Sequence, residues 1–103
     1  MQIQIRWGTI DKSDALGSHV TEQVAHALRH HKDLLTRVDV HLHNDSHGQS
    51  GHDDKRVVIE ARPRKADPLS VDGTGDDFYK TSAAVAKKLE RALRHLVDRK
   101  REH

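Results

Sequence analysis

The chain has 103 residues, of which 34% are hydrophobic and 33% charged, with 18 Lys and Arg against 16 Asp and Glu. This length predicts one domain over residues 1–103, and its core must be almost wholly aliphatic because the chain has one Trp, one Tyr and one Phe. The absence of cysteine excludes a disulfide framework, a thiolate zinc site and a cysteine nucleophile. Neither a signal-peptide pattern nor a run of about 18 apolar residues occurs, which predicts a soluble, cytoplasmic protein.

Strict alternation of apolar and polar residues predicts the strands. In the first of them Ile3, Ile5 and Trp7 point to one side, toward the core, and their polar neighbours point to the other. The same alternation recurs three more times, so the expected strands are 2–7, 37–43, 55–62 and a short one at 69–71. Residues 44–54 contain no apolar residue and are His-rich and acidic, which predicts an exposed, flexible loop.

Apolar residues at helical spacing predict two helices. The first covers about 14–35, with Ser13 as its N-cap. The second extends to about residue 100, with Asp76 or Asp77 as its cap. The segment before it, DGTG at 72–75, predicts a turn in which glycine permits a positive φ.

The element order is therefore β-α-β-β-β-α, which predicts an α+β fold. The first two strands are expected to be parallel through a right-handed crossover, and the two hairpins that follow to be antiparallel. With one apolar face per strand, the simplest closure is a four-stranded mixed sheet with both helices packed on one face. The opposite face is then polar, formed by Gln2, Gln4, Arg6, Arg37, Asp39, His41, His43, Arg56, Glu60 and Arg62.

Positive charge is concentrated at the C-terminal end of the chain. Residues 1–75 hold 10 basic and 11 acidic side chains, whereas residues 76–103 hold 8 and 5. On the predicted second helix the apolar side chains share one arc, while Lys80, Lys87, Arg91, Arg94 and Arg101 line up opposite, flanked by Lys88, His95 and Arg99. Such a cationic stripe suits a phosphate backbone, which it positions without reading bases. A solvated helix face is the alternative interpretation.

The second helix also carries a family resemblance. Residues 76–100, DDFYKTSAAVAKKLERALRHLVDRK, resemble the final helix of the ribosome hibernation-promoting factor and ribosome-associated inhibitor family, also called sigma-54 modulation proteins. The matching features are Asp77-Phe78-Tyr79 and the Lys-Leu-x-Arg-x-Leu core at 88–93. The segment LSVDGTG before the helix and Ser13-Asp14-Ala15-Leu16 at the start of the first helix are similar to the family as well. The order of elements agrees over the whole chain.

This resemblance implies a non-enzymatic, short-form protein that binds the small ribosomal subunit, over the tRNA and mRNA sites, and blocks translation in resting cells under stress, including stationary phase. It implies 16S rRNA as the partner, no membrane, no small-molecule substrate and no cofactor. Of the expected rRNA-binding residues, Lys88 and Arg91 match the family motif. The others lie on the same cationic helix: Lys80, Lys87, Arg94, His95, Arg99 and Lys100. The first helix departs from the family pattern, because Gln23 and His26 occupy the face on which relatives carry basic residues, leaving Arg29 and Lys32 as its fully charged groups.

Two other functions also fit features of the sequence. A general structured-RNA-binding domain fits the same charges, although the polar sheet face lacks the paired aromatic residues that read single strands. A metal-responsive interaction module fits the ten histidines, with His26 and His30 at helical spacing, or His41 and His43 beside the loop histidines His47 and His52. We expect exposed polar positions and no functional metal site.

An enzyme is not expected from these residues. The acidic pair Asp53-Asp54 lies in the loop with no apolar pocket to shift a pKa, and no strand–GxSxG–helix motif occurs around a serine. Trp7 is expected in the core, whereas Tyr79 fits either packing at the rim or contact with RNA.

Overall fold

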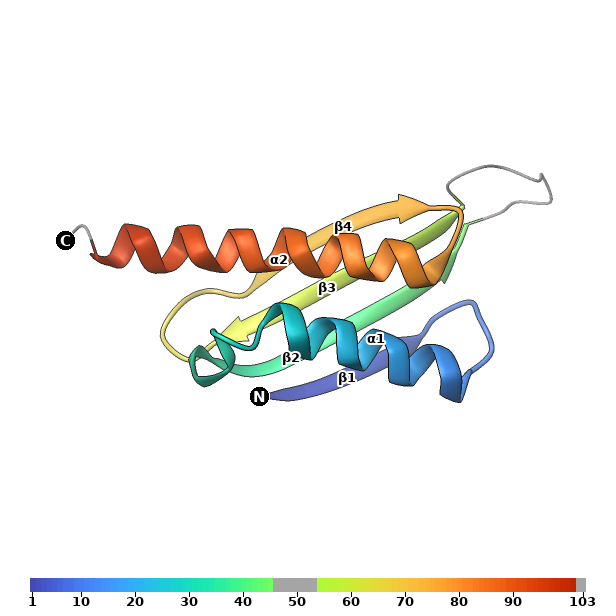
Figure 1. Cartoon of the computed structure of the whole chain (residues 1–103), viewed down its shortest axis with the longest axis horizontal. Helices are drawn as coiled ribbons and strands as arrows, with labels where there is room; N and C mark the ends of the chain where they lie inside the picture. Colours follow the sequence, from blue (N-terminus) through green and yellow to red (C-terminus); the bar gives the residue numbers. More distant parts are fainter. Residues whose placement is uncertain (46–53, 102–103) are drawn as a thin grey trace.

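The computed structural model describes residues 1–45 and 54–101 (Figure 1). In chain order the elements are β1 (Gln2–Trp7), α1 (Asp14–Ala27), the 3-10 helix η1 (Lys32–Leu34), β2 (Leu35–Asn44), β3 (Lys55–Pro63), β4 (Leu69–Gly75) and α2 (Phe78–Arg101). The strands form one sheet in the order β1-β2-β3-β4. Pairing of β1 with β2 is parallel and the other two pairings are antiparallel, which confirms the predicted α+β fold and mixed sheet.

Both helices lie side by side on one face of the sheet (Figure 1). Helix α1 packs over the β1 side and α2 over β3 and β4. The core lies between these two layers, and its buried positions come from α1, β2, β3 and α2, together with Leu28 just after α1. Because alternate residues of a strand point to opposite faces, Val38, Val40 and Leu42 of β2 all reach this core. Each such aliphatic side chain contributes about 1.5–3 kcal/mol through burial.

Helix α1 is shorter than its apolar periodicity predicts. It begins as expected, with the Ser13 hydroxyl accepting a hydrogen bond from the Leu16 amide at 3.2 Å, but it ends at Ala27 instead of near residue 35. Leu35 is fully buried as the first residue of β2. Leu35 follows the buried Leu28 by seven residues, which is the spacing of two helical turns. The apolar periodicity therefore extended the predicted helix to a residue that belongs to a strand.

Strand β4 is longer than predicted, because it continues through Gly73 to Gly75. The turn expected there is wrong, and neither glycine has a φ in the left-handed region. The two glycines serve packing instead: a Cβ on Gly73 would lie 2.8 Å from Cγ2 of Val85, and one on Gly75 would overlap the Thr81 hydroxyl. Glycine therefore lets the first turns of α2 lie directly on β4, where Thr81 and Ser82 are buried.

The start of α2 is fixed by Asp77. Its carboxylate accepts a hydrogen bond from the Tyr79 amide at 2.8 Å, and its carbonyl accepts one from the Thr81 amide at 2.9 Å. This geometry confirms Asp77, of the two candidates, as the capping residue. From there α2 runs for 24 residues, and its C-terminal turns extend beyond the end of the sheet (Figure 1).

The outer face of the sheet is polar, as predicted, although one of its acids is not exposed. Asp39 is only 4% exposed, because Arg37 donates to it at 3.0 Å and Arg6 lies 3.9 Å away. Arg37 also donates to Gln4 at 2.9 Å. This network spans β1 and β2 and satisfies the buried carboxylate, which would otherwise be costly.

Candidate nucleic-acid interface

Helix α2 divides its side chains cleanly between two faces. Val85, Ala86, Leu89 and Leu93 are at most 2% exposed and face the sheet and α1. Most charged side chains of the helix lie on the opposite side, exposed, as the sequence pattern predicts. A long helix anchored by its apolar face holds these cations on a rigid support, so that they can meet a polyanion without a large ordering cost.

A basic groove forms where α2 passes the C-terminal end of α1. Its volume is about 220 Å³, and its lining residues are Ala27, Arg29, Lys87, Glu90, Arg91 and Arg94. We call these six residues the basic groove. Four of them carry a positive charge against one carboxylate: three of these cations are on α2, and Arg29 lies in the turn after α1. The side chain of Arg29 is held by a local hydrogen bond, because its guanidinium donates to the backbone carbonyl of His26 at 2.6 Å.

Glu90 is the one acidic residue in the lining of this groove. Arg94, one turn further along α2, forms an ion pair with it through two hydrogen bonds, and Nε2 of His31 lies 2.9 Å from its Oε2. The hydrogen bonds from Arg94, followed by that from His31, hold the pKa of Glu90 at about 2, against the opposing effect of burial. Glu90 also raises the pKa of Arg94. The carboxylate thus links His31, in the segment between α1 and η1, to α2 and fixes the direction of one guanidinium.

This pair makes a prediction about acid stability. Because the pKa of Glu90 is lowered in the folded state, its contribution is complete above the ordinary pKa near 4.5 and is lost as the pH falls toward about 2. Glu90→Gln should therefore cost about 1–2 kcal/mol of unfolding free energy at pH 7, measured by urea titration. The difference from wild type should shrink between pH 4.5 and 2, whereas Glu22→Gln at an exposed position of α1 should change little. A difference that is constant with pH would contradict this role.

The structure separates the predicted rRNA-binding residues into groups. It brings Lys87, Arg91 and Arg94 together in the basic groove. Lys88 faces the other way, because its ammonium donates to the carbonyl of Asp72 on β4 at 2.8 Å. The remaining described members, Lys80, His95 and Arg99, are exposed along α2 outside the groove. Lys100 lies at the end of α2, and its side chain is outside the described residues.

Two contributors to the site are absent from the set of residues predicted for it. Arg29 brings a fourth cation to the groove, and His31 holds Glu90. The sequence does hint at the role of Glu90, which is the single acidic residue between Lys80 and Val97. Its partner stands 59 residues earlier in the chain, and that pairing follows only from the packing of α1 against α2.

The histidines give no metal site among residues 1–45 and 54–101, where no group of three or more His, Cys, Asp or Glu side chains is placed to hold an ion. The expected helical pair of His26 and His30 is not formed, because α1 ends at Ala27. His41 and His43 share the outer sheet face with parallel rings, their centroids 6.4 Å apart. His47, His52 and Asp53 lie outside the described residues.

The two aromatic side chains singled out by the sequence lie in different surroundings. Trp7 is half-buried and packs against the core, as predicted. Tyr79 is 42% exposed at the first turn of α2, where its ring meets His19 of α1 edge-on with centroids 4.7 Å apart. Tyr79 therefore contributes to the contact between the helices, and the rest of its side chain is exposed to solvent. No helix in the described part of the chain is long and apolar enough to cross a membrane.

Comparison with known proteins identifies the family. The family model described as "Sigma 54 modulation protein / S30EA ribosomal protein" matches residues 3–101, which is nearly the whole chain. The chain belongs to this family. The resemblance stated from the α2 motif is thereby confirmed, and it places the chain among ribosome-associated modulation proteins. A search of curated protein sequences finds no significant match.

Solved structures agree with the family fold. A ribosomal subunit interface protein from Coxiella burnetii is similar with a TM-score of 0.79 and 21% identity, over 95% of this chain and 99% of that one. The N-terminal domain of Protein Y from Thermus thermophilus is similar with a TM-score of 0.66 and 17% identity, over 92% of this chain and 94% of that one. At these identities the likeness concerns the arrangement of strands and helices.

Proposed function

We propose that this protein is a non-enzymatic translation inhibitor that binds the small ribosomal subunit and occupies its decoding region through α2. The observation that carries the proposal is the basic groove, where three cations of α2 meet Arg29 of the turn after α1, in a chain of a ribosome-associated family. The partner would be 16S rRNA, and the protein would act in the cytoplasm during hibernation of resting or stressed cells. The proposed contacts are the cations of the basic groove, with Lys80, His95, Arg99 and Lys100 along the same helix.

The chemistry of the groove fits folded RNA. Arginine guanidinium groups donate two hydrogen bonds to one phosphate, and lysine ammonium groups add point charge. Arg29 and Arg91 are exposed, and their guanidinium groups have no carboxylate partner among the described residues. They are therefore ready to bind phosphate without first breaking an ion pair. Arg94 keeps Glu90 as a partner and is held in place for a further contact.

Shape and phosphate contacts would then supply the affinity, with no reading of bases. Affinity of this kind falls with salt, by roughly 0.7–0.9 in log K per log unit of salt for each phosphate neutralised. Lys88 donates a hydrogen bond to β4, so it is a weaker candidate for contact with rRNA than the sequence motif alone suggests.

Competition with tRNA tests the proposed position on the ribosome. Purified small subunits carrying mRNA should lose initiator tRNA from the decoding region as the protein is added, and reconstituted translation should stop at the same protein concentration. Free tRNA in excess should not remove the protein from the subunit, since a general structured-RNA binder would be titrated by it. Simultaneous binding of protein and tRNA to one subunit would contradict occupation of the decoding region.

A further inference from the structure

A second surface lies on the other side of α1, at the edge of the sheet. The strand order β1-β2-β3-β4 places β1 at an edge, paired with β2 on one side and with no described strand on the other. Half of the backbone N–H and C=O groups of such a strand point outward and are free to pair with another chain. This edge is six residues long and contains no proline or lysine, two residues that often protect an edge from pairing, and its single charged residue is Arg6.

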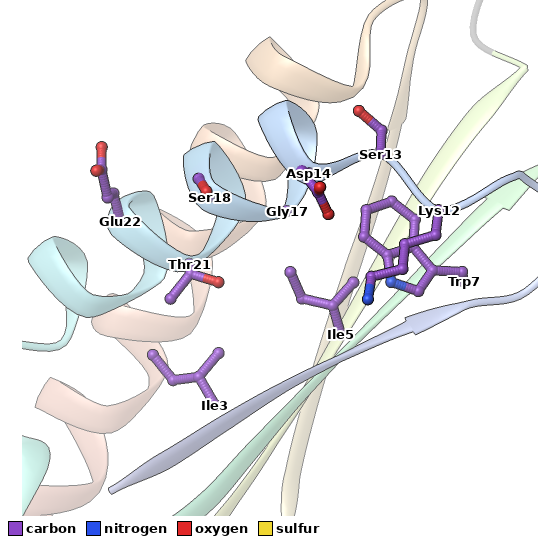
Figure 2. A pocket seen from close by; sticks show the side chains of 10 residues that line it. All are labelled: Ile3, Ile5, Trp7, Lys12, Ser13, Asp14, Gly17, Ser18, Thr21 and Glu22. Carbon is purple, nitrogen blue, oxygen red and sulfur yellow. The ribbon is translucent and has the colours of Figure 1, made fainter.

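Beside this edge is a shallow hollow of about 630 Å³ between β1 and α1 (Figure 2). Ile3, Ile5 and Trp7 rise from β1 toward the helix and are only partly buried. Thr21 of α1 points down at the two isoleucines, as Figure 2 shows. Gly17 brings the helix backbone close to the indole, since a Cβ there would lie 3.2 Å from Cζ2 of Trp7. The floor is therefore apolar, and it lies directly beside the free strand edge.

The charge of this hollow is opposite to that of the basic groove. Its charged lining residues are Lys12, Asp14 and Glu22, which leaves a net negative charge, whereas four cations and one carboxylate line the basic groove. A phosphate backbone is repelled by such a rim, and a basic segment is attracted. The two surfaces flank α1 and share no lining residue, so different partners can occupy them at the same time.

We propose that this hollow binds an extended peptide of another protein, which adds to the sheet as a strand beside β1. Its main chain would hydrogen-bond to the outer edge of β1, and its alternate apolar side chains would fill the space over Ile3, Ile5 and Trp7. Basic residues between or beside the apolar ones would face Asp14 and Glu22. The partner class is thus a short, basic, alternating apolar segment, and the site is independent of the proposed ribosome contact.

A peptide selection tests this inference with the full chain. Short random peptides displayed on phage would be selected against wild-type protein, and the enriched sequences synthesised. We expect enrichment of alternating apolar residues with Lys or Arg, and amide chemical-shift changes over Gln2–Trp7 and Gly17 on titration. Failure to enrich any such peptide, or shift changes confined to α2, would overturn the proposal. Dimerisation of the protein through β1 would overturn it too, by making a second copy the occupant.

Variants assign the binding to the hollow. Thr21→Trp fills the space over the isoleucines and should raise the peptide Kd by about tenfold or more, while Ala25→Trp, an equally bulky change at an exposed position outside the lining, should leave it unchanged. Glu22→Lys should raise the Kd by a few fold at low salt and less at high salt. Equal affinity of the Thr21→Trp and wild-type proteins, both shown folded by circular dichroism, would exclude the hollow.

Discussion

The double charge reversal of Lys87→Glu and Arg91→Glu is expected to weaken binding to the small ribosomal subunit by about a hundredfold or more. Both residues line the basic groove and are exposed, so the reversal replaces attraction to phosphate with repulsion. The fold should survive, because neither side chain faces the core. The affinity is measured by filter binding or fluorescence anisotropy at fixed salt, with circular dichroism to check the fold.

A matched control keeps the change in net charge and moves it elsewhere. Lys12→Glu with Arg62→Glu alters the same number of charges at exposed positions of the loop before α1 and of β3, outside the basic groove. It should weaken binding only a few fold, through the overall field of the protein. Equal losses in the two double variants would show that net charge alone drives binding, and unchanged binding of the groove variant would exclude the groove as the interface.

The second large effect concerns the support of the groove. Leu89→Ala should lower the free energy of unfolding by about 3 kcal/mol, within the range of about 2–5 for a large buried aliphatic residue. Leu89 is fully buried on the face of α2 that meets the sheet. The same substitution at Leu34, which is 44% exposed, should cost less than about 1 kcal/mol. Urea unfolding measures both.

The Leu89 variant also separates stability from binding. Below its unfolding transition Leu89→Ala should still bind the small subunit, because the cations stay on the opposite face of the helix. A loss at Leu89 as small as that at the exposed Leu34 would show that the buried face of α2 has been assigned wrongly.

Several parts of this structure could be predicted from the sequence because they depend on local periodicity. Alternation located the strands, and the apolar arc of α2 located its buried face and hence its exposed cations. Connection rules then gave the parallel first pair and the two antiparallel hairpins, which periodicity leaves open. Capping followed from side-chain chemistry alone, as the hydrogen bond from the Leu16 amide to Ser13 shows.

The predicted and observed elements differ where contacts with a segment distant in sequence determine the local structure. Leu35 has helical spacing from Leu28, but pairing of β2 with β1 and β3 draws it into a strand. Gly73 and Gly75 were expected in a turn, yet they are strand residues against which α2 packs. These choices depend on contacts between segments far apart in sequence, which local propensity does not contain.

The candidate site shows the same limit. Helical spacing grouped Lys88 with the other cations, but the helix rotation set by the core turns it toward the Asp72 carbonyl. Arg29 joins the groove only because α1 ends beside α2. The sequence therefore predicted that α2 carries a cationic face, while the composition of the groove and the role of Glu90 required the packing of the two helices.

Binding of this protein to the small ribosomal subunit is tested most directly by sedimentation. The purified protein would be centrifuged with ribosomes through a sucrose gradient at near-physiological salt and in excess tRNA. We expect the protein to co-migrate with the small subunit or the intact ribosome. Protein that remains at the top of the gradient, with ribosomes shown to be active, would contradict the account.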